Sequence, residues 1–471
     1  MIETASARET TSIWLACLVA LTVLRLILAA TMPLAPDEAY YWLWSQHLQA
    51  GYYDHPPMVA LFIRAGTLIA GNTAFGVRLF GPLAAAAGSY FLWRAAEDFC
   101  PNRDAGLIAA GLFNATLVAG AGAIIITPDT PLLLFWSAGL AAAGRLLATR
   151  DRRWWLGIGA AAGFALLSKY TGALLIAGFG LWLLTSNAGR RQMKSPWPWA
   201  GLALAFIIFV PNLAWNRAHH WVSYLKQGGR VAQFDPARAL QFLGELIFGQ
   251  IGLVTPIVFG LFGYAIWRLC RAQNAVAQLL LWLTLLPAAV FVEHACFDRV
   301  QANWPAIIYP AACIAAACLP AAILGRWLKP ALGLGFGMTL LVYAQSAAAL
   351  FPLPPTRDPA ALQLAGWGPF SAELARHKAA FFTSDDYATL AELAFHAPPG
   401  TVVAGFEPRW QYLSFPSAKA LAGISGILVT RHHDATCPVL LGTFARLSSR
   451  GPVMTYRLCS FTAPATGSLL P

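Results

Sequence analysis

Long runs of apolar residues recur between residues 12 and 350 of this 471-residue sequence. A helix needs roughly 20 apolar residues to cross the hydrocarbon core of a bilayer, because each residue adds about 1.5 Å along the helix axis. Hydrophobic residues make up 58% of the chain and charged residues only 11%, and the mean hydropathy is +0.57. These values exclude an ordinary soluble globular protein and predict a polytopic α-helical membrane protein.

The spacing of these runs predicts eleven membrane-spanning helices. The first run carries Arg25 and lacks a small-residue cleavage site, so we expect a retained span rather than a signal peptide. The predicted spans cover residues 12–31, 75–95, 105–126, 130–147, 154–168, 171–187, 198–215, 244–266, 276–293, 304–323 and 331–350.

The net charge of +11 indicates topology rather than nucleic-acid binding. The Lys and Arg residues fall mainly in short clusters between apolar runs, and all of these clusters share one face if every span is counted. The positive-inside rule assigns that face, and with it the N-terminus, to the cytoplasm. The clusters are Arg94 with Arg103, Arg145 with Arg150, Arg152 and Arg153, Arg190 with Arg191 and Lys194, Arg268 with Arg271, and Arg326 with Lys329.

The opposite, extracytoplasmic face collects the unusual polar motifs. They lie in the first external loop (32–74), in "TPDTP" (127–131), in "SKYTG" (168–172), in the loop 216–243 and in "EHACFDRVQANWP" (293–305).

The character of the chain changes after residue 350, where several prolines interrupt the helical pattern. Helical patterns near 370–396 are followed by the β-branched or aromatic runs "TVVAGF", "GILVT" and "MTYRLCSF". We therefore predict a transmembrane domain over 1–350 and a small α/β domain over 351–471. An odd number of spans places the small domain outside the cytoplasm.

Eight cysteines are present, but no CxxC or Cys/His spacing accompanies them, so the sequence predicts no metal site. Cys437 and Cys459 both fall in the external domain, where oxidising conditions permit a disulfide. Their spacing alone leaves open whether they meet.

Asp37 and Glu38 follow Pro36 directly after the first span. A carboxylate at a membrane surface can act as a general base toward a hydroxyl, bind a cation, or cap the helix that begins here. Asp37 fits both the capping role and the catalytic role.

Asp54 and His55 precede two prolines that can start another helix, whose positive N-terminal end would attract an anion. An ordinary interfacial histidine is the alternative for His55. Asp129 lies between two prolines at the turn of a hairpin, where a turn residue is the default expectation.

Two cations lie on the same face. Lys169 sits at membrane depth, where an unpaired ammonium costs about 2.5–3.5 kcal/mol, so it needs a partner or a ligand. Arg299 lies just before a span and can either snorkel to the interface or hold a phosphate. With Tyr170, the neighbour of Lys169, these residues are candidates for substrate binding.

The motifs "PDEAYYW", "YYDHPP", "TPDTP", "SKYTG" and "RVQANWP", in that order, resemble the bacterial members of the protein mannosyltransferase and aminoarabinose transferase superfamily. The resemblance covers roughly residues 10–350. It implies a GT-C fold and an integral membrane glycosyltransferase that takes a sugar from a polyprenyl-phosphate carrier, with inversion at the anomeric carbon.

The resemblance also implies roles for individual residues. Asp37 matches the proposed catalytic base with Glu38 as its companion, and Asp129 matches a second acid lining the cavity. Lys169 matches a lysine that contacts the lipid phosphate, and Arg299 a basic residue of the late external loop. His55 departs from the family, because the aminoarabinose transferases carry a lysine there, which argues against an aminoarabinose substrate. Galacturonosyltransferases acting on lipopolysaccharide are looser relatives.

The implied acceptor is a glycolipid, a lipopolysaccharide or a protein on the periplasmic side of a bacterial inner membrane, and no nucleic acid or cofactor is expected. A transporter is the alternative from another class, since charges within a membrane can mark a transport pathway. An assembly protein ranks below it, because that role leaves the ordered motifs unexplained.

Overall fold

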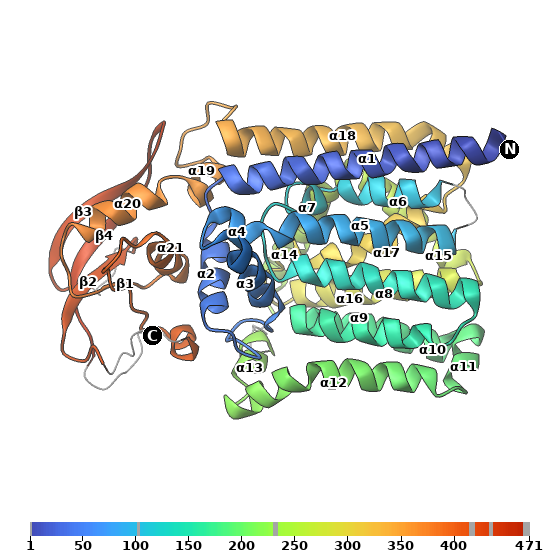
Figure 1. Cartoon of the computed structure of the whole chain (residues 1–471), viewed down its shortest axis with the longest axis horizontal. Coiled ribbons are helices and arrows are strands. Elements are labelled where there is room, and N and C mark those ends of the chain that lie inside the picture. Colours follow the sequence, from blue (N-terminus) through green and yellow to red (C-terminus); the bar gives the residue numbers. More distant parts are fainter. Residues whose placement is uncertain (1, 101–103, 229–233, 414–419, 433–436, 465–471) are drawn as a thin grey trace. The chain divides into compact units, whose positions relative to one another are not determined.

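The structure is a computed structural model that describes residues 2–100, 104–228, 234–413, 420–432 and 437–464 (Figure 1). The chain divides into two compact units. The first unit contains residues 1–27, 55–59 and 79–342, and the second contains residues 28–54, 60–78 and 343–471. The second unit therefore joins most of the first external loop to the C-terminal part of the chain.

The first unit is a bundle whose long helices run roughly parallel to one another (Figure 1). Its elements are α1 (Ile2–Thr31), α5 (Phe80–Phe99), α6 (Ala105–Asn114), α7 (Leu117–Gly120), α8 (Asp129–Thr149), α9 (Trp154–Ser168), η1 (Tyr170–Gly172), α10 (Ala173–Thr185), α11 (Asn187–Met193), α12 (Trp197–Ala218), α13 (Val222–Gly228), α14 (Pro236–Val254), α15 (Pro256–Arg271), α16 (Ala275–Ala295), η2 (Trp304–Ile308), α17 (Tyr309–Ala317) and α18 (Ala321–Ala348).

Six of the described helices are long and apolar enough to cross a membrane, and the number rises to eight if each of two bent pairs is one span. The predicted polytopic membrane protein is thus confirmed. The other three predicted spans, 105–126, 154–168 and 304–323, correspond to shorter apolar helices.

Three predicted spans are not continuous. The span at 244–266 is wrong, because α14 and α15 meet at an angle of 107°. Thr255 takes a φ of 71° there, immediately before Pro256, and a proline excludes the helical conformation for the residue before it. The spans at 105–126 and 304–323 likewise break after Asn114 and after Ala317.

Small residues let the helices of the bundle approach closely. A Cβ added to Gly159 on α9 would lie 2.1 Å from the carbonyl oxygen of Gly201 on α12. Only glycine tolerates this contact, which is typical of helix packing inside membranes.

The second unit combines short helices with a four-stranded sheet of order β1-β2-β4-β3 (Figure 1). Strands β1 and β2 are parallel and the other pairs are antiparallel. The elements are α2 (Pro36–Gln46), α3 (Met58–Ala70, of which residues 60–70 belong to this unit), α4 (Ala74–Arg78), α19 (Pro359–Leu364), α20 (Trp367–Ala375), β1 (Phe382–Ser384), α21 (Tyr387–His396), η3 (Pro408–Tyr412), β2 (Ser425–Thr430), β3 (Leu440–Ser448) and β4 (Gly451–Thr462).

The predicted small α/β fold is confirmed, with β2 and β4 in the runs "GILVT" and "MTYRLCSF". The run "TVVAGF" contributes only an isolated bridge between Val403 and Phe382. Its alternate side chains do pack inward, because Phe406 contacts the rings of Phe381 and Phe461 in the core beneath the sheet.

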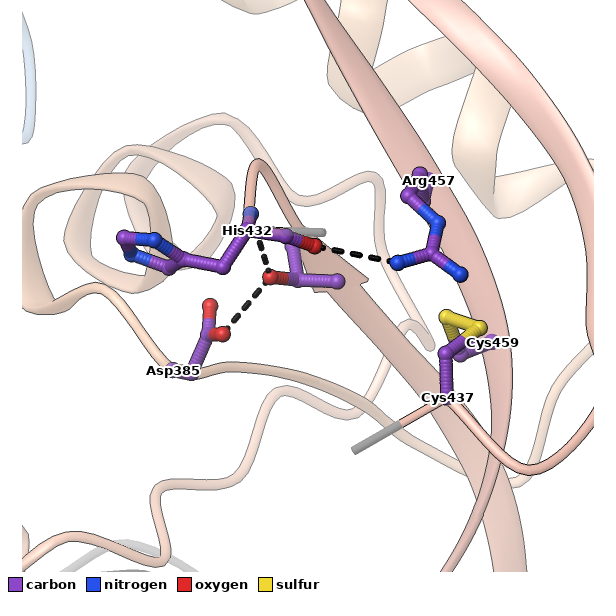
Figure 2. Close-up of a disulfide and its surroundings, with 6 residues drawn as sticks. Asp385, His432, Cys437, Arg457 and Cys459 are labelled. Atoms are coloured by element: carbon purple, nitrogen blue, oxygen red, sulfur yellow. Dashed lines mark hydrogen bonds between the residues drawn. A yellow bond between two sulfur atoms is a disulfide. The ribbon is translucent and has the colours of Figure 1, made fainter. Parts of the chain in front are cut away.

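Cys437 and Cys459 form a disulfide, with their Cα atoms 5.1 Å apart (Figure 2). The pairing that the sequence left open is therefore present, and it links the start of the β3 segment to β4. Beside it, Thr430 donates a hydrogen bond of 2.6 Å to Asp385, and Arg457 donates one of 3.1 Å to the carbonyl of His432 (Figure 2). A second disulfide, Cys100–Cys318 in the first unit, was not predicted.

Candidate active site

Helix α2 carries the first acidic motif, and it begins at Pro36 with Ala35 as its N-cap. The capping role considered for Asp37 is therefore wrong, because Asp37 already lies inside the first turn. Glu38 performs the related function, since its Oε2 accepts a 2.9 Å hydrogen bond from the backbone N–H of Ala35. The two adjacent acids thus have different surroundings.

Glu38 forms a fully buried ion pair with Arg78 of α4. The Nε of Arg78 donates to Glu38 Oε1 at 2.8 Å, and its Nη2 contacts Oε2. Arg78 also donates to the carbonyl oxygens of Met32 and Pro33, each at 2.7 Å. These contacts tie the chain before α2 to α4, so the geometry points to a structural role for Glu38.

Asp37 differs from Glu38 in that its side chain reaches solvent. Its Oδ1 accepts a 2.8 Å hydrogen bond from the hydroxyl of Tyr387, the first residue of α21. Among the described residues, Asp37 has no salt-bridge partner. A carboxylate with this surrounding remains accessible to a reacting group.

The electrostatic environment raises the pKa of the Asp37 carboxyl above its ordinary value. Desolvation by nearby protein atoms is the main cause, and the negative charges of Glu38 and Asp54 act in the same direction. The hydrogen bond from Tyr387 and the charge of Arg409 oppose this shift. A raised pKa makes a carboxylate a stronger base, which suits proton abstraction from a hydroxyl.

Asp54, from the second acidic motif, lies in the same cluster of side chains. Its Oδ2 accepts a 2.8 Å hydrogen bond from Tyr40 and lies 3.6 Å from Arg409 of η3. The guanidinium of Arg409 lies over the ring of Tyr387 at 4.2 Å. We call Asp37, Tyr40, Asp54, Tyr387 and Arg409 the Asp37 cluster.

A second cluster lies in the first unit, where Lys169 ends α9 and Asp129 begins α8. The ammonium of Lys169 lies 2.8 Å from Asp129 Oδ1, and both side chains are buried. Asn303 donates a 2.6 Å hydrogen bond to Asp129 Oδ2, and the ring of Trp304 lies 5.6 Å from the Lys169 ammonium. We call these four residues the Lys169 cluster. The partner that the depth of Lys169 required is therefore Asp129.

The other candidates have separate surroundings. Arg299 pairs with Glu245 of α14 at 2.7 Å and is 65% exposed. Tyr170 accepts a 3.3 Å hydrogen bond from Asn216 and contacts the ring of Tyr224. His55 is half-buried in the first unit.

The sequence did not single out Asn303, Tyr387 or Arg409. Asn303 stands inside the motif "RVQANWP", so its signal was present, but the charge of Arg299 drew the assignment. Tyr387 and Arg409 lie in the C-terminal part of the chain and carry no motif. Within the described part of the chain, no group of three or more His, Cys, Asp or Glu side chains is placed to hold a metal ion.

Glu392 of α21 is a further buried acid near the first motif. Its side chain is 0% exposed, its nearest ionic contact is His396 at 3.4 Å, and neither oxygen has a hydrogen-bond partner. Burial raises the pKa of Glu392 to about 7, the charge of Glu38 adds to this effect, and His396 and Arg446 oppose it.

We expect the C-terminal part of the chain to lose stability as the pH rises through about 7, because folding favours the protonated form of Glu392. Between the ordinary Glu pKa of about 4.3 and this value, the folded state binds a proton that the unfolded state has lost. Hydrogen exchange of β2 and β4 amides, corrected for intrinsic rates, should show stronger protection at pH 5.5 than at pH 8. Glu392→Gln should remove the difference, whereas the exposed control Glu373→Gln should retain it. Equal pH dependence in both variants would contradict the assignment.

Comparisons with known proteins agree with the motifs and the fold. Residues 54–215 match the dolichyl-phosphate-mannose-protein mannosyltransferase family. The lipid A galacturonosyltransferase RgtD of Rhizobium johnstonii is 30% identical over 324 residues, which cover 67% of this chain and 65% of RgtD. The match thus spans slightly less than two thirds of that relative.

Solved structures of ArnT from Cupriavidus metallidurans share the fold over nearly the whole chain. The form bound to undecaprenyl phosphate superposes with a TM-score of 0.62 at 16% identity, covering 97% of this chain and 99% of that one. The apo form also gives a TM-score of 0.62 at 16% identity, covering 98% and 100% of the two chains. The protein therefore has the GT-C fold. Together with the sequence matches, this makes it a member of the GT-C glycosyltransferase superfamily, as the ordered motifs predicted.

Proposed function

We propose that this protein is a membrane glycosyltransferase that moves a sugar from a polyprenyl-phosphate carrier to a glycolipid on the periplasmic face of a bacterial inner membrane. Two printed likenesses support these substrate classes: RgtD is a lipid A galacturonosyltransferase, and the ArnT neighbour binds undecaprenyl phosphate. A uronic acid such as galacturonic acid is the first sugar to test, and lipid A the first acceptor.

The observation that carries the proposal is the accessibility of Asp37. Of the three acids in the motifs of the first external loop, Glu38 and Asp54 are buried and Asp37 is exposed. A base that must take a proton from an incoming hydroxyl has to be reachable by it. Asp37 meets that requirement, and its raised pKa increases its basicity.

The reaction is a single displacement. Asp37 accepts the proton of the acceptor hydroxyl, whose oxygen forms a bond to the anomeric carbon of the sugar. The bond between that carbon and the phosphate oxygen breaks, and the polyprenyl phosphate leaves with the bonding electron pair. The phosphate is already a good leaving group, so charge stabilisation and positioning are the main tasks left to the protein.

Lys169 is the group that we assign to the departing phosphate. An ammonium has three N–H donors, and the contact with Asp129 uses one of them. The remaining donors can bind phosphate oxygens in a partly desolvated setting, where such hydrogen bonds are strong. Asp129 and Asn303 then serve to hold Lys169 in place.

Lys169→Ala should raise the KM for the polyprenyl-phosphate sugar by about 10-fold to 100-fold, the range expected for losing a hydrogen bond to a charged group. The KM for the acceptor should change much less. Lys194→Ala, at the exposed end of α11, serves as the matched control. Donor kinetics equal to those of the wild type would reduce Lys169 to a partner of Asp129.

Transfer by the purified full-length protein in detergent tests the function itself. We expect mass spectrometry to detect lipid A that has gained one sugar, together with free polyprenyl phosphate, in the absence of any gradient. A transporter would produce no new covalent product. Absence of product with a panel of polyprenyl-phosphate hexoses, pentoses and uronic acids would contradict the proposal.

A further inference from the structure

We propose that Tyr387, from the C-terminal part of the chain, is a positioning residue for the base Asp37. The inference rests on the proposed function and assigns to this part of the chain a role in the transfer reaction. Its starting point is the 2.8 Å hydrogen bond between the Tyr387 hydroxyl and Asp37 Oδ1, which joins residues 350 positions apart.

The backbone of Tyr387 is fixed by the start of α21. Asp386 is the N-cap of this helix, and its carboxylate accepts hydrogen bonds from the backbone N–H and the hydroxyl of Thr389, at 3.3 and 2.8 Å. A capped first turn has little conformational freedom. Tyr387 therefore projects from a defined point.

The ring of Tyr387 is held from two sides. Arg409 lies over the ring at 4.2 Å, and Tyr40 meets it edge to face with ring centroids 5.3 Å apart. Tyr40 lies on α2, three residues after Asp37, so the same helix carries both the base and one wall of the clamp. Arg409 is in turn held by Asp54 at 3.6 Å and by Glu407 at 3.4 Å.

The direction of the hydrogen bond follows from the acidities of the two groups. Burial raises the pKa of the Tyr387 phenol above its ordinary value, so the phenol keeps its proton and donates it to the carboxylate. This bond fixes Oδ1 and the plane of the carboxylate. It thereby presents Oδ2 as the oxygen that takes the proton of the acceptor.

The bond also adjusts the basicity of Asp37. Donation to the charged carboxylate stabilises that form, so the hydroxyl of Tyr387 lowers the pKa of Asp37 against the opposing effect of burial. Removing the hydroxyl should raise the pKa of Asp37 further. A residue that served only to fold the chain would not move this pKa in a defined direction.

Tyr387→Phe is the decisive variant, because it removes one oxygen and retains the ring beneath Arg409. We expect kcat to fall by about 10-fold to 100-fold, the range associated with a displaced catalytic group, with the KM values changing less than kcat. The acidic limb of the pH profile of kcat/KM should move to higher pH. Tyr412→Phe is the matched control, since Tyr412 stacks on Tyr53 in the same unit and should keep the wild-type profile.

Difference infrared spectroscopy supplies a readout that does not depend on activity. The carboxylate band lost in Asp37→Asn identifies Asp37, and this band should titrate at higher pH in Tyr387→Phe than in the wild type. An unchanged titration would overturn the inference, whether or not the variant is active.

The outcomes separate this inference from the function beneath it. If Asp37→Asn is inactive while Tyr387→Phe has the wild-type kcat and pH profile, the positioning role is wrong and the proposed function stands. If Asp37→Asn keeps full activity, the base assignment fails, and the role of Tyr387 fails with it.

Discussion

Asp37→Asn is expected to lower kcat by about 10²- to 10⁴-fold, the contribution of a general base, without loss of the folded protein. The substitution keeps the shape of the side chain, and the amide oxygen of Asn can still accept the hydrogen bond from Tyr387. Because the side chain of Asp37 reaches solvent and has no ion-pair partner among the described residues, little stability depends on its charge. The measurement is the transfer rate of purified protein, with thermal unfolding of the same preparation.

Asp151→Asn is a suitable control, because Asp151 is a partly exposed acid whose ion pair is with the nearby Arg153. It should retain the wild-type rate. Full activity of Asp37→Asn would remove Asp37 from the mechanism and require another base, of which Asp54 is the nearest candidate in the Asp37 cluster. Loss of activity together with unfolding would instead show that Asp37 supports the structure.

The raised pKa of Asp37 adds a pH dependence to the same experiment. Activity requires the deprotonated carboxylate, so it falls as the pH drops through the pKa of Asp37. Burial and the neighbouring acids raise this pKa, and we therefore expect the acidic limb of kcat/KM above the ordinary aspartate value of about 3.9. The limb should be absent from the residual activity of Asp37→Asn.

The helical bundle could be predicted from the sequence because hydropathy reports the length of an apolar run directly. The break at Thr255 was missed for the same reason: residues 244–266 are apolar throughout, and hydropathy does not register the conformational restriction that Pro256 imposes. In the C-terminal part, β1 has only three residues and is too short to show alternation.

Within the candidate site, local physics predicted what it could reach. The membrane depth of Lys169 required a partner, and Asp129 fulfils that requirement. The contact between Asp37 and Tyr387 spans 350 positions and joins two residues that each look ordinary in their own segment. Only the three-dimensional structure brings them together.

Glu38 is the residue for which the sequence and the geometry suggest different roles, and Arg78 provides the means to separate them. We expect Glu38→Gln to destabilise the segment around α2 by about 3–5 kcal/mol, because it leaves the buried guanidinium of Arg78 without its counter-charge. Hydrogen exchange of the α2 amides in the full-length protein measures this loss. A change below about 1 kcal/mol, typical of an exposed pair, would contradict the buried ion pair.

The double variant Glu38→Gln/Arg78→Gln distinguishes structure from catalysis. It removes both charges, retains an acceptor for the backbone N–H of Ala35, and leaves an amide that can donate to the carbonyl of Met32 or Pro33. If Glu38 acts by holding the loop, the double variant should lose less stability than the sum of the single variants and should regain activity relative to Glu38→Gln. A catalytic carboxylate would give the opposite result, because Gln at position 38 would remain inactive whatever stood at position 78. Recovery in the double variant would therefore leave Asp37 as the reacting acid of this motif, with Glu38 and Arg78 fixing the helix that carries it.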